Sequence, residues 1–210
     1  VRVAVCVPSV RVADPTYNGE AHFSELRAAY DAGAHYAVCP ELGLSSYTCG
    51  DLFFQDRLLE GSLEALATLA EATRTWNLVF TVGLPLRVDG ALYNCAVTLG
   101  GGRARAVAPK AYPPNYREFY ELRWFQPARH ATSQTVKLLA DEVPFGTDVL
   151  LALPEHPGFV LHTEICEDLW VPVPRSALAA LAGATVLANL SASNVTVGKF
   201  EYRRDLVRMS

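Results

Sequence analysis

The sequence predicts an α/β protein with a mixed sheet. Strand-like apolar runs alternate with helical patterns over residues 1–84, which is typical of strands joined by helices. A hairpin turn signal at residues 88–91 then introduces strands that run antiparallel. The chain has 210 residues, 50% of them hydrophobic, and a domain of this size buries roughly 70% of its unfolded surface. Because the sequence contains no repeat or linker, we predict one domain over residues 1–210.

The first half of the chain is predicted to alternate strand and helix before the hairpin. The expected elements are a strand at 1–7, a helix at about 20–32, a strand at 36–39, a helix at about 58–75 and a strand at 78–84. Gly33 is expected to close the first helix. The second helix carries one apolar stripe, formed by Leu59, Leu63, Leu66, Leu69 and Ala70.

The second half of the chain is predicted to hold the hairpin, a long loop and a further strand–helix pattern. The expected elements are strands at 92–99 and 104–108, a loop at 110–133, strands at 149–153 and 159–165, a helix at 175–182, a strand at 185–190 and a helix from about 199. A loop as long as 110–133 inside a compact domain usually carries function, so we expect it to lie over a site.

Composition narrows the class of partner. The formal net charge of −4 argues against nucleic acid or an anionic membrane as the main partner. The sequence contains no run of about 20 apolar residues of the kind that crosses a bilayer. We therefore expect a soluble, cytoplasmic protein that acts on a small molecule.

Cysteine and histidine spacings argue against a disulfide framework and against a metal site. The five cysteines are an odd number and form no Cys-x-x-Cys pair, and the five histidines have no ligand-like spacing. The sequence also lacks the serine-hydrolase elbow, the His-Glu-x-x-His motif and the glycine-rich phosphate loops.

Three polar residues follow the carboxyl ends of predicted strands. Glu41 comes after the strand at 36–39, Lys110 after the strand at 104–108 and Cys166 after the strand at 159–165. Ligand crevices of α/β sheets lie along this edge, so residues far apart in sequence can converge there. Each residue also has a plainer interpretation: Cys166 as a small buried hydrophobe, Glu41 as a solvated loop residue and Lys110 as a surface lysine.

Together the three residue types fit thiol-dependent amide hydrolysis. A carboxylate can take the thiol proton, the thiolate can attack an sp² carbon, and an ammonium can stabilise the oxyanion that forms. We expect backbone amides at the turn after Ile165 to stabilise the thiolate of Cys166.

The sequence around these residues resembles the nitrilase, or carbon–nitrogen hydrolase, superfamily. Within it, the chain is most similar to the glutaminase domains of glutamine-dependent NAD⁺ synthetases. The resemblance runs nearly the whole length of the chain. It is carried by the segments at 40–47, 109–121, 144–148, 164–170, 189–199 and 202–204.

The resemblance implies an αββα sandwich, here truncated at its C-terminus, and a role for each matched residue. Cys166 would be the nucleophile, Glu41 the general base and then acid, and Lys110 the oxyanion-stabilising cation, helped by a backbone N–H just after Cys166. Glu121 would orient Lys110 and the attacking water. The residues expected to hold L-glutamine are Tyr116, Ser193 and Lys199.

The family pattern also extends beyond this sequence. The resemblance implies a γ-glutamyl thioester and release of ammonia, which a synthetase domain of the full-length chain would use for ATP-dependent amidation of deamido-NAD⁺. That domain has no counterpart in this sequence, so ATP and Mg²⁺ are expected only there and no cofactor is expected here. The family further implies a homo-oligomer. Two alternatives stay open: a free-standing amidase for another small amide, and a catalytically silent assembly module.

Overall fold

The computed structural model describes residues 1–209, and its larger sheet is mixed, as predicted. Its five strands lie in the order β1-β2-β3-β4-β5. The first three are parallel, and the last two extend the sheet as antiparallel hairpin strands. Their bounds are β1 (Val3–Val5), β2 (Tyr36–Val38), β3 (Val79–Val88), β4 (Ala91–Gly100) and β5 (Arg103–Pro109).

A second, three-stranded sheet faces the first. It has the order β10-β9-β8, with β9 and β10 parallel and β8 antiparallel to β9. A separate two-stranded hairpin lies beside β5. The bounds are β8 (Leu150–Ala152), β9 (Val160–Ile165) and β10 (Val186–Leu190), with β6 (Thr135–Leu138) and β7 (Asp141–Pro144) in the hairpin.

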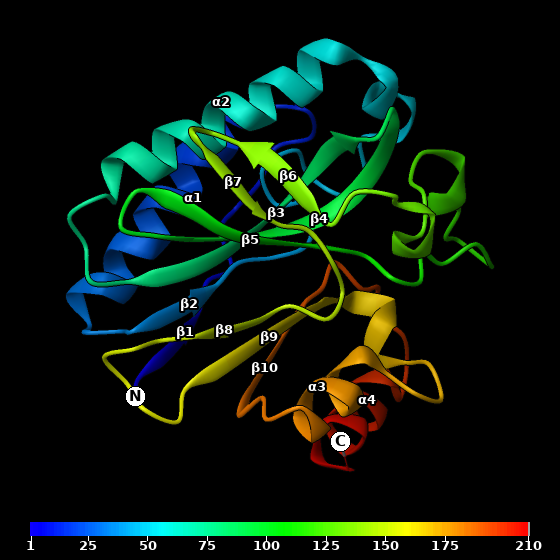
Figure 1. Cartoon of the computed structure of the whole chain (residues 1–210). Coiled ribbons are helices and arrows are strands. Elements are labelled where there is room, and N and C mark those ends of the chain that lie inside the picture. The colour runs from blue at the N-terminus through cyan, green and yellow to red at the C-terminus, as the bar shows by residue number, and fades with distance from the viewer. Residues whose placement is uncertain (210) are drawn as a thin grey trace.

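The helices enclose the two sheets, so the chain forms the αββα sandwich that the resemblance implies (Figure 1). The pair α1 (Pro15–Asp31) and α2 (Asp56–Ala72) covers one face of the large sheet. On the other side of the molecule, α3 (Arg175–Leu181) packs against β9, and α4 (Lys199–Met209) ends the described chain with its Tyr202 stacked on Trp170. Within residues 1–209, none of these helices is long and apolar enough to cross a membrane.

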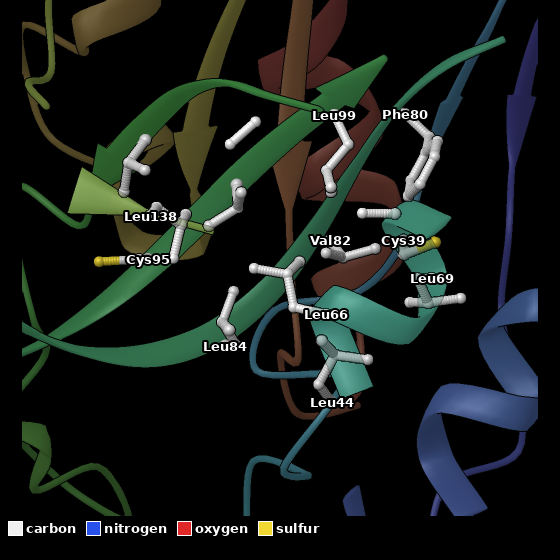
Figure 2. Close-up of a cluster of buried hydrophobic side chains, with 14 of the residues drawn as sticks. Cys39, Leu44, Leu66, Leu69, Phe80, Val82, Leu84, Cys95, Leu99 and Leu138 are labelled. Carbon is white, nitrogen blue, oxygen red and sulfur yellow. The ribbon is translucent and has the colours of Figure 1, made fainter. Parts of the chain in front are cut away.

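The main apolar core lies between the helix pair and the large sheet (Figure 2). Side chains of α2 meet alternate residues of β3 and β4, because every second strand residue points to the same face. Four of the five predicted stripe residues of α2 are buried, whereas Leu63 is exposed, so the prediction was wrong for that residue. The residues labelled in this core are Cys39, Leu44, Leu66, Leu69, Phe80, Val82, Leu84, Cys95, Leu99 and Leu138.

The layer between the two sheets is more polar than this core. The Tyr36 hydroxyl donates to Thr81 Oγ1 at 2.9 Å, and Thr81 Oγ1 lies 2.9 Å from Thr98 Oγ1. Side chains of β9 and β10, among them Ile165 and Leu190, complete this layer. All five cysteines are buried and free.

The structure corrects several predicted elements. The first helix begins at Pro15 rather than about residue 20, because Asp14 caps it by accepting a hydrogen bond from the Tyr17 amide at 3.1 Å. The strand predicted at 1–7 is regular only at Val3–Val5. The hairpin β6–β7 was not predicted, since each of its strands has only four residues and gives a short hydrophobic pattern.

Candidate active site

The structure brings two of the three predicted strand-end residues into direct contact and places the third beside them. The Lys110 ammonium Nζ lies 2.6 Å from Glu41 Oε1, although 69 residues separate them in sequence. Cys166 follows β9 at the same edge, and the charges of Glu41 and Lys110 both act on its thiol. Glu41 and Lys110 are 2% and 1% exposed, so neither is the solvated residue of the plainer interpretation.

The long loop after β5 returns a second carboxylate to Lys110. A 3₁₀ turn begins at Glu121, and its Oε1 accepts a hydrogen bond from Lys110 Nζ at 2.7 Å. The same oxygen accepts from the Tyr47 hydroxyl at 2.7 Å. The loop therefore covers the Lys110 side chain and places Glu121 beside it.

Lys110 stays cationic in spite of its burial. Burial alone would lower the pKa of the ammonium, but the attraction of Glu41 and Glu121 outweighs it and raises the pKa above its ordinary value. Burial raises the pKa of Glu121, although the Lys110 charge and the Lys110 and Tyr47 hydrogen bonds act against that rise. The buried cluster thus holds one cation between two carboxyl groups.

Close backbone packing fixes the Glu41 segment. A Cβ at Gly83 of β3 would lie 2.4 Å from the Leu42 nitrogen and 2.6 Å from the Pro40 carbonyl, so only glycine allows this approach. The side chain of Glu41 is held at both oxygens. Oε1 also accepts from Asn94 Nδ2 at 2.8 Å, and Oε2 accepts from the Ala192 amide at 2.9 Å.

Cys166 occupies a strained turn. Its φ is +47°, in the left-handed region that costs a non-glycine residue about 1–2 kcal/mol. The Asp168 carboxylate holds this turn by accepting backbone hydrogen bonds from Ile165 at 3.1 Å, Ala111 at 3.2 Å and Tyr112 at 2.8 Å. Asp168 thus ties the Cys166 turn to the residues that directly follow Lys110.

The Cys166 thiol is neutral at rest, which corrects the expectation that local amides stabilise a thiolate. Burial and the nearby Glu41 charge raise its pKa to about 12, although Lys110 and a hydrogen bond from Ser191 act in the opposite direction. The turn after Ile165 is a four-residue 3₁₀ helix, too short to offset these effects. Formation of the thiolate therefore needs a base during attack.

A cavity of about 340 Å³ opens onto Cys166. All three residues predicted to hold a substrate line it, namely Tyr116, Ser193 and Lys199. Glu41, Lys110 and Glu121 do not line this cavity and are buried. Of these four candidate catalytic residues, Cys166 is the one that a ligand in the cavity would meet.

Further residues that were not predicted also line the cavity, among them Glu118, Glu167, Trp170 and Asn194. The Tyr116 hydroxyl donates to both oxygens of Glu167, and Lys199 Nζ donates to Asn194, which in turn donates to Glu118. Trp170 lies 5.4 Å from the Lys199 ammonium, measured to a ring centroid. Their only sequence signal is their position within the 116–121, 164–170 and 189–199 segments.

No metal-binding site forms among residues 1–209. Within the described residues 1–209, no group of three or more His, Cys, Asp or Glu side chains could hold a metal ion.

Sequence comparison decides the family. The family model of carbon–nitrogen hydrolases matches residues 2–210. The chain belongs to the carbon–nitrogen hydrolase family. Among curated relatives of this carbon–nitrogen hydrolase domain, the glutamine-dependent NAD(+) synthetase of Mycobacterium tuberculosis is 47% identical over 208 residues, and that of Homo sapiens is 30% identical over 218 residues. These alignments cover 99% and 100% of this chain but 30% of each relative, so the chain spans about a third of their length.

Solved structures of carbon–nitrogen hydrolases confirm the fold. A glutamine-dependent NAD(+) synthetase from Cytophaga hutchinsonii superposes with a TM-score of 0.86 at 28% identity, covering 99% of this chain and 33% of that one. An amidase from Nesterenkonia sp. superposes with a TM-score of 0.72 at 17% identity, covering 95% of this chain and 68% of that one. The family and fold that the sequence predicted are thus both confirmed.

Proposed function

We propose that this carbon–nitrogen hydrolase domain is a glutaminase that converts L-glutamine to glutamate and ammonia. The observation that carries the proposal is the buried Lys110 ammonium, bonded to Glu41 and Glu121, whose charges act on the Cys166 thiol. Such a cluster is costly to bury, and each of its groups has a use in amide hydrolysis. The relatives at 47% and 30% identity are glutamine-dependent enzymes by name, which supports glutamine as the amide.

The first half of the reaction would acylate Cys166. Glu41 takes the thiol proton as sulfur attacks the side-chain amide carbon, and Lys110, with a backbone N–H just after Cys166, stabilises the oxyanion. Glu41 then returns the proton to the departing nitrogen, so ammonia leaves and a γ-glutamyl thioester remains. A neutral resting thiol fits this order of steps, because the thiol proton moves to Glu41 only when the substrate is in place.

The second half would release glutamate. Glu41, ionised again once ammonia has left, takes a proton from a water molecule that attacks the thioester carbon. Lys110 and the backbone N–H stabilise the second oxyanion, and Glu121 keeps Lys110 in position through its 2.7 Å hydrogen bond. Collapse of this second oxyanion breaks the C–S bond, and Glu41 returns the proton to the Cys166 sulfur.

The cavity suits the charged end of an amino acid. Lys199 is a cation that would pair with the α-carboxylate, and Tyr116 and Ser193 would add hydrogen bonds. Glu167 and Glu118 line the same cavity and offer carboxylates to the α-ammonium group. Opposite charges on its wall favour glutamine over a simple aliphatic amide, which lacks both charges.

The ammonia would serve a second reaction. Because the named relatives are NAD(+) synthetases of which this chain covers 30%, we propose that a synthetase domain of the same full-length protein uses it. That domain would carry out the ATP- and Mg²⁺-dependent amidation of deamido-NAD⁺, whereas no cofactor is assigned to the hydrolase domain. We further propose a cytoplasmic homo-oligomer.

Ammonia and glutamate release from L-glutamine tests the proposal. We expect glutamine-selective release by the wild-type chain, at least 1000-fold reduced in Cys166→Ala because no thioester can form. L-Asparagine and aliphatic amides serve as comparison substrates. Preferred hydrolysis of an aliphatic amide would favour a free-standing amidase instead, and silence from a folded wild-type chain would contradict the glutaminase assignment of this domain.

A further inference from the structure

The two carboxylate oxygens of Glu41 have different partners. Oε1 accepts two hydrogen bonds, from the Lys110 ammonium at 2.6 Å and from Asn94 Nδ2 at 2.8 Å. Within residues 1–209, Oε2 accepts one hydrogen bond, from the Ala192 amide at 2.9 Å. A carboxylate oxygen has about two lone-pair positions, so Oε1 is fully occupied and Oε2 keeps one position open.

The oxygen with the open position is held by a segment that also contacts the Cys166 turn. Strands β9 and β10 are parallel neighbours, so the segments that follow them begin at the same edge of the small sheet. At the end of β10, Asn189 Nδ2 lies 3.3 Å from the Cys166 carbonyl oxygen. Ala192 then donates to Glu41 Oε2 from the same segment. Oε2 is therefore the oxygen of Glu41 that is linked to the Cys166 side of the site.

Asn94 lies on β4 and is 0% exposed. Every second residue of a strand shares a face, and Ala96, two residues further along β4, packs in one apolar cluster with Cys166. The backbone of Asn94 has a second role, because its carbonyl oxygen accepts a hydrogen bond from the Lys110 amide at 2.8 Å. One buried residue thus holds Glu41 by its side chain and Lys110 by its backbone.

The orientation of the Asn94 amide follows from its partner. A carboxylate oxygen only accepts, so Nδ2 must face Glu41 and Oδ1 must point away from it. Oδ1 is buried and has no hydrogen-bond partner within residues 1–209. An unpaired buried acceptor lowers stability, which offsets the gain from the Glu41 hydrogen bond. What distinguishes Asn94 from an apolar residue of the same shape is therefore the donor that it offers to Glu41.

We propose that Asn94 is a positioning residue that occupies Oε1 of Glu41 and so leaves Oε2 to take the proton. The inference rests on the proposed role of Glu41 as the base in glutamine hydrolysis. The proton passes from the Cys166 sulfur to Oε2 and later from Oε2 to the departing nitrogen, and Asn94 keeps its own hydrogens throughout. Without Asn94, Oε1 regains an open position and the carboxylate is no longer fixed in one arrangement, which slows proton transfer.

Steady-state kinetics of L-glutamine hydrolysis by Asn94→Leu tests this role, because leucine has nearly the same shape but no donor. We expect kcat to be about 10- to 100-fold lower than in wild type, the usual effect of losing a hydrogen bond to a charged group. KM should stay within about threefold, since Asn94 does not line the cavity at Cys166. Thermal unfolding should give a Tm within about 5 °C of wild type, because leucine also removes the unpaired Oδ1. Asn94→Ala, which cannot overpack the site, should show the same loss of kcat.

Thr98→Val is the matched control, because Thr98 lies on the same face of β4, is 2% exposed and loses its 2.9 Å hydrogen bond with Thr81. Its kcat should stay within about threefold of wild type. A wild-type kcat in both Asn94 variants, an equal loss in Thr98→Val, or a loss of activity that lies wholly in KM would overturn the inference. Failure of the glutaminase proposal would instead appear as glutamine hydrolysis that survives Cys166→Ala, or as a folded wild-type chain that leaves glutamine intact.

Discussion

At the scale of single residues, the Lys110 ammonium supplies the positive charge of the buried cluster. It is buried between Glu41 and Glu121, and hydrogen bonds of 2.6 and 2.7 Å join it to them. Desolvation of these groups cancels much of their attraction, so the cluster adds little net stability. Its value is chemical, because a fixed cation in a dry site stabilises developing negative charge better than water does. Loss of the cation would leave two carboxyl groups facing each other.

We predict that Lys110→Met destabilises the chain by about 3–5 kcal/mol at pH 8, the usual cost of stranding a buried charge. Lys110 has a raised pKa, so in the wild type the ammonium stays charged and its contribution to stability is constant throughout pH 5–8. In the variant, protonation relieves the repulsion, so the destabilisation should be smaller at pH 5. Urea unfolding at both pH values measures it. Lys137→Met, an exposed lysine of β6, is the control, and equal losses for both variants would contradict the prediction.

At the scale of elements, β3 sets the position of the Glu41 segment. Its Gly83 lies against the backbone of Pro40, Glu41 and Leu42, which leaves no room for a side chain. The Leu44 amide also donates to the Gly83 carbonyl at 3.1 Å. Strand and segment therefore move together, and a change on β3 is transmitted to the carboxylate without any contact to substrate.

We predict that Gly83→Ala destabilises the chain by about 1–3 kcal/mol, the cost of overpacking, and lowers glutamine hydrolysis more than 100-fold by displacing Glu41. Gly61→Ala on α2 adds the same methyl group where the nearest atom is a Pro15 ring carbon at 3.3 Å. Alanine favours a helix over glycine, so this control should stay within about 1 kcal/mol and remain active. Equal activities in the two variants would show that Gly83 does not position Glu41.

At the scale of the whole molecule, the site forms where the two sheets are joined at their carboxyl ends. Most strand segments and the position of Glu41, Lys110 and Cys166 at strand ends were predictable, because apolar runs and turn signals mark a strand and its end. Asn94, Asp168 and Ser191 were not predictable. A single polar residue has no pattern of its own and acts only through partners that the fold supplies. Asp168 joins the sheets through the Ala111 and Tyr112 amides.

Burial of Asp168 at this junction should make the stability of the chain depend on pH. Burial raises its pKa to about 7, although three backbone amides and Lys110 act against the rise. The native state therefore binds more protons than the unfolded chain between about pH 4 and 7, so this group's contribution to stability falls as pH rises through that window. Asp168→Asn cannot titrate. Its free energy of unfolding, relative to wild type, should rise by about 2 kcal/mol between pH 5 and 7 in urea titrations. A difference that stays constant over this range would show that the Asp168 carboxyl is already ionised at pH 5, held by its amide partners alone.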